Sequence, residues 1–242
     1  MASKRPGECC GNGHLHDGTS KGRIETFAGV ETYISGSPSS KVLFFLTDII
    51  GHKFTNAQLL ADTYAAHGYH VIMPDLFKGD PWLLDEFRPK DLTFQQWIVN
   101  HMPEHTAPIV EQVLKGIKEE LKPAKIAAVG YCYGAKHVTR LLAGEIDVGF
   151  TAHPSFVEIE ELAAIKGPLS IAAAETDSIF TTELRHESEA KLAEIKATYQ
   201  INLYSGVSHG FAVRGDMENK WEKWAKEKAL EQAIEWFRFH LG

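Results

Sequence analysis

The sequence has few cysteines, no long apolar run and no excess of basic residues. Three cysteines are too few for a disulfide framework and fit a reducing compartment. No run of 18 apolar residues occurs, so we expect no membrane-spanning helix. The 25 Lys and Arg against 32 Asp and Glu give a net charge of -7, which argues against nucleic-acid and anionic membrane partners. The charged start has no apolar segment behind it, unlike a secretory signal, so we expect a cytoplasmic protein.

The remaining composition is that of an ordinary globular protein, with 44% hydrophobic and 24% charged residues among 242. Residues 1–22 are rich in Gly, Ser, Thr, Asp and Asn and lack apolar periodicity, which predicts an N-terminal arm or loop. No internal repeat or break in composition follows, so we expect residues 23–242 to form one domain.

Short apolar runs alternate with helical patterns along this domain. The expected strands are 24–27 and 30–34, paired as a hairpin around Gly29, and then 41–46, 69–73, 125–129, 148–152, 169–174 and 199–204. The expected helices are 55–68 with a capping box at Thr55 and Gln58, 94–121 divided by Pro103 and Pro108, one that includes Val138 and Leu141 to Ala143, 181–197, and one from Asn219. This alternation predicts an α/β fold whose mostly parallel central sheet is covered by helices on both faces.

A Gly-x-Cys-x-Gly pattern, Gly130 to Gly134, joins the buried run 125–129 to the helical pattern that follows. Its spacing is typical of a nucleophile elbow with sulfur in place of the usual serine oxygen. Such a sharp turn strains the backbone and leaves no room for side chains two residues before and after the nucleophile. The turn directs Cys132 and the N–H of Tyr133 toward one point near a helix N-terminus, which favours a thiolate and an oxyanion. We interpret Cys132 as a nucleophile, the alternative being a buried structural cysteine.

Two partners for Cys132 follow later strands. Asp177 lies just past the strand expected at 169–174, and His209 lies in a glycine-flanked segment after the last strand. Elbow folds place their acid and histidine in this chain order, which predicts a Cys132, His209 and Asp177 triad. Glu175 or Asp147 could serve as the acid instead, and His209 could merely cap a loop.

With these motifs the chain resembles the dienelactone hydrolases of the α/β-hydrolase fold, over about residues 24–240. The resemblance implies that Asp48 stands where the family has a glutamate that hydrogen-bonds the thiol and helps to take its proton. It also implies that the N–H groups of Ile49 and Tyr133 form the oxyanion hole. Asp48 is therefore a further catalytic candidate, the alternative being a turn residue at the strand end. It is one methylene shorter than glutamate, so unless the backbone lies closer to the nucleophile, we expect it to contact Cys132 only through a water or not at all.

The resemblance extends to two further segments. Arg214 approximately matches the family's substrate-binding arginine, but it lies one residue farther along the chain. The segment from Cys9 to His14 is similar to the start of fungal members. Cys9, Cys10, His14 and His16 have metal-ligand chemistry, but without a second Cys-x-x-Cys we interpret the segment as an arm packed on the surface, with no metal.

Further substrate-binding candidates are chosen by their position in the chain, with packing or surface exposure as the alternative for each: Trp82, Tyr131, His153, Phe211 and Arg214. No Gly-x-Gly-x-x-Gly follows an early strand, and we expect no cofactor.

The sequence thus predicts a cysteine-dependent hydrolase of a small ester, lactone or thioester. One alternative is a non-hydrolytic thiol protein, in which Cys132 senses oxidants or captures electrophiles. Another is a degenerate hydrolase that acts as a scaffold, although the intact set of three candidate residues counts against it. The oligomeric state is left open, a homodimer being one option.

Overall fold

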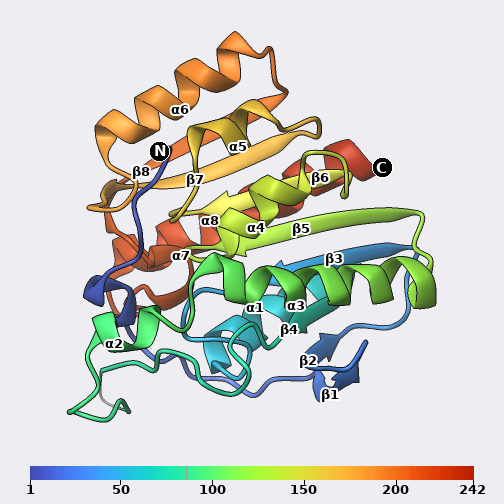
Figure 1. Ribbon diagram of the computed structural model, residues 1–242, viewed down its shortest axis with the longest axis horizontal. Coiled ribbons are helices and arrows are strands. Elements are labelled where there is room, and N and C mark those ends of the chain that lie inside the picture. The colour runs from blue at the N-terminus through green and yellow to red at the C-terminus, as the bar shows by residue number, and fades with distance from the viewer. Residues whose placement is uncertain (86) are drawn as a thin grey trace.

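The computed structural model describes residues 1–85 and 87–242, except for the side chains of residues 8 and 9. These residues form an eight-stranded sheet in the order β1-β2-β4-β3-β5-β6-β7-β8 (Figure 1). The first two strands form the expected hairpin, β2 and β4 are antiparallel, and the other neighbours are parallel, so the mostly parallel sheet is confirmed. The strands are β1 (Arg23–Phe27), β2 (Val30–Ser35), β3 (Lys41–Leu46), β4 (His70–Pro74), β5 (Lys125–Tyr131), β6 (Val148–Ala152), β7 (Leu169–Thr176) and β8 (Tyr199–Ser208).

Helices cover both faces of the sheet, as expected. They are α1 (Thr55–Ala66), α2 (Phe94–Ile98), α3 (Pro103–Gly116), α4 (Gly134–Leu141), α5 (Ile159–Ala163), α6 (Thr182–Glu194), α7 (Phe211–Arg214) and α8 (Lys220–Leu241), with short helical turns at η1 (Glu8–Gly11) and η2 (Ile117–Leu121). Helices α3, α4, α5 and α6 contact one another in turn on one face, whereas α1, α7 and α8 lie on the other (Figure 1). Within the described residues, no helix has the length and hydropathy that crossing a bilayer requires.

The buried core follows from the apolar runs of the sequence. Strands β3, β4, β5 and β6 are buried along nearly their whole length, because helices shield both faces of a parallel sheet from water. Their carboxyl ends therefore meet at one edge of a rigid sheet, which is where side chains from distant parts of the chain come together.

Some local predictions were wrong. The capping box expected at Thr55 is absent: Phe54 is the N-cap of α1 without a side-chain bond, and Gln58 donates to the carbonyl of His52 instead. A capping box does form at Thr93 and Gln96, at the start of α2. Pro103 divides the segment as expected, because it is the first residue of α3. Pro108 lies inside that helix and does not divide it.

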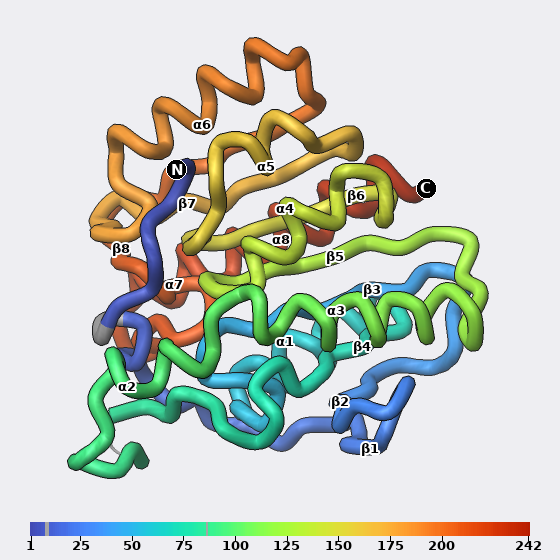
Figure 2. Tube along the Cα trace, viewed as in Figure 1, coloured from blue at the N-terminus to red at the C-terminus, as the bar shows by residue number. Residues whose placement is uncertain are grey.

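The N-terminal arm does not simply pack on the surface. The N–H groups of Ala2 and Ser3 donate to the carbonyl of Val157 at 2.8 and 2.9 Å, and farther along the N–H of His14 donates to the carbonyl of Arg214 at 3.0 Å. Between these anchors the arm crosses the edge at which the parallel strands end (Figure 2). The expectation of a surface arm was wrong for Cys10, which is 0% exposed.

Candidate active site

The turn between β5 and α4 has the backbone geometry of a nucleophile elbow. Cys132 has a φ of 49°, in the left-handed region that L-residues rarely occupy. A Cβ on Gly130 would lie 2.6 Å from the carbonyl oxygen of Gly134, and one on Gly134 would lie 2.0 Å from that of Leu46. Both glycines are therefore required by close backbone contacts, and the strained turn holds Cys132 at the carboxyl edge of the sheet.

Cys132, His209 and Asp177 form one continuous chain of polar contacts. Nε2 of His209 lies 3.1 Å from Sγ of Cys132, and Nδ1 of His209 lies 2.9 Å from Oδ2 of Asp177. The other carboxylate oxygen of Asp177 accepts from the N–H groups of Ile179 and Phe180 at 2.8 and 3.0 Å. These backbone donors fix the carboxylate, which in turn orients the imidazole toward the sulfur.

The charges within this chain of contacts favour an ionised thiol. Burial opposes ionisation of Cys132, but the contacts with Cys10 and His153 and the charge of His209 hold its pKa well below the ordinary value. Burial likewise opposes protonation of His209, yet the adjacent Cys132 and Asp177 raise its pKa to about 10. Although burial acts against it, the bond to His209 lowers the pKa of Asp177. These shifts all favour a thiolate–imidazolium pair beside a carboxylate.

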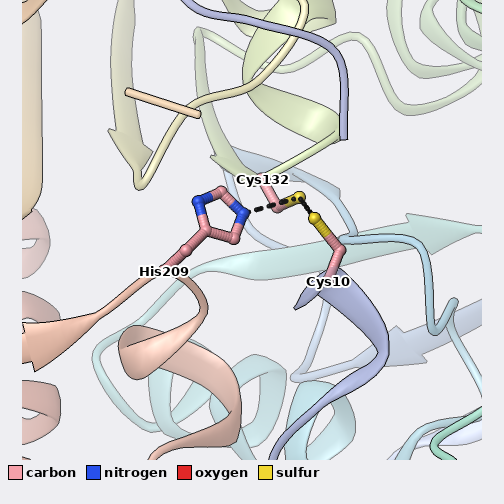
Figure 3. A group of neighbouring side chains, drawn as sticks. All are labelled: Cys10, Cys132 and His209. Atoms are coloured by element: carbon pink, nitrogen blue, oxygen red, sulfur yellow. Dashed lines mark hydrogen bonds between the residues drawn. The ribbon is translucent and has the colours of Figure 1, made fainter. Parts of the chain in front are cut away.

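A second cysteine lies against the candidate nucleophile (Figure 3). Sγ of Cys10 is 3.7 Å from Sγ of Cys132, and Oγ of Ser155 is 3.6 Å from the same sulfur. Sulfur and nitrogen atoms of Cys10, Cys132 and His209 all lie within 4.8 Å of one another, a donor set that suits a soft metal ion. Sequence reasoning did not assign Cys10 to this site. The similarity of the Cys9–His14 segment to fungal relatives was the one available signal.

Asp48 and Arg214 form a buried ion pair at the same edge. Nη1 of Arg214 donates to Oδ2 of Asp48, while the N–H of Ile50 donates to Oδ1 at 3.1 Å. Burial raises the pKa of Asp48, and the charge of Arg214 opposes that rise. Within the described part of the chain, no hydrogen bond joins Asp48 to Cys132 directly.

The other candidate residues differ in their surroundings. His153 is fully buried, with its ring centroid 4.9 Å from that of His209, and burial lowers its pKa to about 4. Phe211 packs against His153. The hydroxyl of Tyr131 is 2.8 Å from that of Tyr64 in the core, which favours the packing alternative for Tyr131.

Residues of the arm line two cavities, Leu15 the first and Asn12, Gly13 and His14 the second. One, of about 500 Å³, is mainly apolar and is lined by Leu15, Ile50, Trp82, Phe87, Arg88 and Leu92 among others. The second, of about 350 Å³, is more polar and is lined by Asn12, His14, His209, Phe211, Arg214 and Glu222 among others. Gly11 lies against the Trp82 ring, and Cys10 of the arm contacts Cys132, which is 0% exposed.

Ile49 and Tyr133, the two oxyanion-hole candidates, lie just beyond the ends of neighbouring strands. Both follow strands that pair in parallel, since Leu46 of β3 is in register with Gly130 of β5. In elbow folds the two N–H donors of an oxyanion hole come from segments in these positions.

Comparison with known proteins identifies the family. The sequence model of the dienelactone hydrolase family matches residues 30–241. The chain is 44% identical to hydrolase pyvD of Aspergillus violaceofuscus, covering 100% of this chain and 99% of that protein. It is 31% identical to dienlactone hydrolase 1 of Gibberella moniliformis, covering 97% and 94%.

Solved structures agree on the fold. The dienelactone hydrolase-like promiscuous phosphotriesterase P91 from metagenomic libraries superposes with a TM-score of 0.70 at 14% identity, covering 92% of this chain and 99% of that one. Dienelactone hydrolase from Anabaena variabilis superposes with a TM-score of 0.62 at 11% identity, covering 94% and 99%. With the sequence matches, these findings show that the chain is a hydrolase enzyme belonging to the dienelactone hydrolase family.

Proposed function

We propose that the protein hydrolyses a small ester, lactone or thioester by covalent catalysis at Cys132. The observation that carries the proposal is the position of His209, 3.1 Å from the Cys132 sulfur and 2.9 Å from the Asp177 carboxylate. A nucleophile, a base and a group that orients the base are the three parts that acyl transfer requires. This chemistry needs no cofactor.

In the acylation step, the Cys132 thiolate attacks the substrate carbonyl carbon. Negative charge then develops on the carbonyl oxygen, where the N–H groups of Tyr133 and Ile49 would stabilise it. As the tetrahedral intermediate collapses, the carbon–oxygen bond to the leaving group breaks and protonated His209 donates its proton to that oxygen. The products are a thioester on Cys132 and an alcohol, which stays on the same molecule when the substrate is a lactone.

In the deacylation step, neutral His209 takes a proton from water, and the resulting hydroxide attacks the thioester carbonyl. The carbon–sulfur bond breaks, which releases the carboxylic acid and restores the thiolate–imidazolium pair. Asp177 stabilises the imidazolium in both steps, in agreement with the raised pKa of about 10 for His209.

Substrate entry requires the arm to move. Cys132 is fully buried beneath Cys10, whereas His209 borders the polar cavity of about 350 Å³. Displacement of residues 10–15 would join this cavity to the apolar one of about 500 Å³. A substrate that spans both would present an ester or lactone at Cys132 and an apolar group near Trp82. Arg214 would contact the polar end.

Turnover of p-nitrophenyl acetate tests the proposal against the non-hydrolytic alternative. A hydrolase releases nitrophenolate continuously, well beyond one equivalent per protein, because the thioester is hydrolysed. A thiol that only captures electrophiles gives a single stoichiometric burst and then stops. A burst without turnover, both for this ester and for small lactones, would refute the assignment.

Two further parts of the proposal follow from the chemistry. The substrate is a small molecule, as in the family to which the chain belongs. A cytoplasmic location suits an enzyme with a reactive thiolate, since cytosolic reductants keep thiols reduced.

A further inference from the structure

We propose that Cys10 and Cys132 form a reversible disulfide when the enzyme meets a peroxide, so that the pair is a redox modification site. The two sulfur atoms lie 3.7 Å apart and are both fully buried (Figure 3). A disulfide has a sulfur–sulfur distance of about 2.05 Å, so the atoms need to approach by less than 2 Å in this case. The inference requires only a reactive thiolate at Cys132 and does not depend on the hydrolytic role proposed above.

The position of Cys10 is fixed by contacts on both sides of it. Before it, the N–H of Lys4 donates to the carbonyl of Ile179 at 3.0 Å, and the N–H of Phe156 donates to the carbonyl of Lys4 at 2.8 Å. After it, the carbonyl of Asn12 accepts from Nε of Arg214 at 3.0 Å. The contact between the sulfurs is therefore part of an ordered packing arrangement, and not the chance orientation of a loose terminus.

Asn56 anchors the arm farther along. Its side-chain nitrogen donates to the carbonyls of His14 at 2.8 Å and Val213 at 2.9 Å, and its oxygen accepts from the N–H of His16 at 2.8 Å. Since Asn56 is fully buried in α1, this end of the arm is joined to the helical layer of the domain.

Cys132 has the properties of an oxidant-sensitive thiol. Its contact with His209 favours the thiolate, which is the form that peroxides attack. His209 also borders the polar cavity, through which a molecule of the size of hydrogen peroxide can approach more easily than an ester. Without a second thiol, such a cysteine proceeds through sulfenic acid to irreversibly oxidised forms.

The reaction has two steps. The Cys132 thiolate attacks one peroxide oxygen, the oxygen–oxygen bond breaks, and Cys132 becomes a sulfenic acid. The departing oxygen takes the proton of His209 and leaves as water, or as an alcohol if the peroxide is organic. Two electrons pass from sulfur to the peroxide.

Cys10 then resolves the sulfenic acid. Neutral His209, whose ring nitrogen lies within 4.8 Å of the Cys10 sulfur, takes the thiol proton. The Cys10 thiolate attacks the Cys132 sulfur, the sulfur–oxygen bond breaks, and the hydroxide recovers the proton from His209 as water. Overall, two thiols and one hydrogen peroxide give one disulfide and two waters, and a reducing thiol reverses the change.

The resulting disulfide would remove the nucleophile and fasten the arm across the site at once. Its formation would protect Cys132 from irreversible oxidation, because the sulfenic acid is consumed before further peroxide reaches it.

The test is oxidation of the whole protein with a small excess of hydrogen peroxide, followed by intact mass and by mapping of non-reduced peptides. We expect a mass loss of about 2 Da, a crosslinked peptide joining Cys10 to Cys132, and restoration of the original mass by dithiothreitol. If the protein hydrolyses esters, this activity should fall as the disulfide forms and return when dithiothreitol reduces it. The peptide crosslink remains measurable if the protein proves to have no hydrolytic activity.

Matched variants make the result specific to Cys10. In Cys10→Ser, peroxide should add oxygen to Cys132, with a gain of about 32 Da or more that dithiothreitol does not reverse. Cys9→Ser should behave as the wild type. The proposal is overturned if Cys132 is crosslinked to Cys9, if wild-type Cys132 gains oxygen while Cys10 stays reduced, or if Cys10→Ser recovers as completely as the wild type.

Discussion

Arg214 donates a hydrogen bond through Nη1 to Oδ2 of Asp48, and both side chains are buried near Cys132. The carboxylate is therefore engaged by a guanidinium, and its negative charge is largely balanced. A carboxylate paired with a cation raises the pKa of a nearby thiol less than an unpaired carboxylate does. The ion pair thus reduces the cost of ionising Cys132 in the presence of a nearby acid.

The substitution Asp48→Asn tests this relationship. It removes a negative charge and leaves the charge of Arg214 unopposed, so the pKa of the Cys132 thiol should fall further. The measurement is the pH profile of Cys132 alkylation by iodoacetamide. The wild-type midpoint should lie below about 8.5, the value of an unperturbed cysteine, and the variant's midpoint should be lower still.

Asp147→Asn is the matched control, because Asp147 pairs with Lys125 at the opposite end of β5. It should leave the midpoint unchanged. A wild-type midpoint above that of an unperturbed cysteine, which falls in Asp48→Asn, would instead mean that Asp48 keeps the resting thiol protonated.

Replacing the nucleophile should separate activity from stability. Cys132→Ala should abolish hydrolysis, while the free energy of unfolding should stay within about 1–2 kcal/mol of the wild type, because the side chain is small. Cys132→Ser should also be a poor enzyme, since an alcohol is much less acidic than the thiol for which the site is arranged. Ester hydrolysis rates and thermal unfolding curves provide the measurement. Wild-type activity in Cys132→Ala would show that the nucleophile is another residue.

Asp177→Asn should lower kcat by roughly 10²–10⁴-fold, since the carboxylate orients His209 and stabilises its protonated form. Asp177 contributes to the raised pKa of about 10 for His209. Removing its charge lowers that pKa, so the alkaline decline in kcat, which follows loss of the imidazolium proton, should move to lower pH. Rates measured from pH 6 to about 10.5 would show the shift.

Glu175→Gln is the appropriate comparison for this variant. Glu175 also follows the apolar part of β7, but its carboxylate accepts from the N–H of Gly206 at 2.7 Å and is exposed. It should retain nearly the wild-type pH profile. If it shows the larger loss of kcat, the acid has been assigned to the wrong residue.

Deletion of residues 1–20 should preserve a cooperative unfolding transition but lower its midpoint. The sheet begins at β1, beyond the deletion, whereas the bonds of the arm to Val157, Asn56 and Arg214 are lost, each contributing about 1 kcal/mol. Exposure of Cys132 should also speed its alkylation at a fixed pH. Unfolding monitored by circular dichroism would give the first result, and mass-resolved alkylation the second. A truncated protein without a cooperative transition would make the arm part of the folding core.

The sequence alone determined the features that depend on local steric constraints and on the spacing of apolar residues. The apolar runs identified the strands, because a strand buried on both faces carries no alternating polar positions. Glycines two residues on either side of Cys132 indicated a sharp turn, since close backbone contacts leave no space for a Cβ. The positions of Asp177 and His209 after later strands then indicated a shared edge, because parallel strands end on the same side of a sheet.

Only the tertiary structure decided which side chains meet there. Cys10 and Cys132 are 122 residues apart and Asp48 and Arg214 are 166 apart, and no sequence period relates the members of either pair. The arm has no apolar repeat, so its burial of Cys10 depends on hydrogen bonds with distant backbone groups and with the Arg214 side chain. Likewise, the short helices α5 and α7 are not among the helices expected from the sequence. Packing and long-range hydrogen bonds, which depend on the complete fold, determine these features where local propensity is weak.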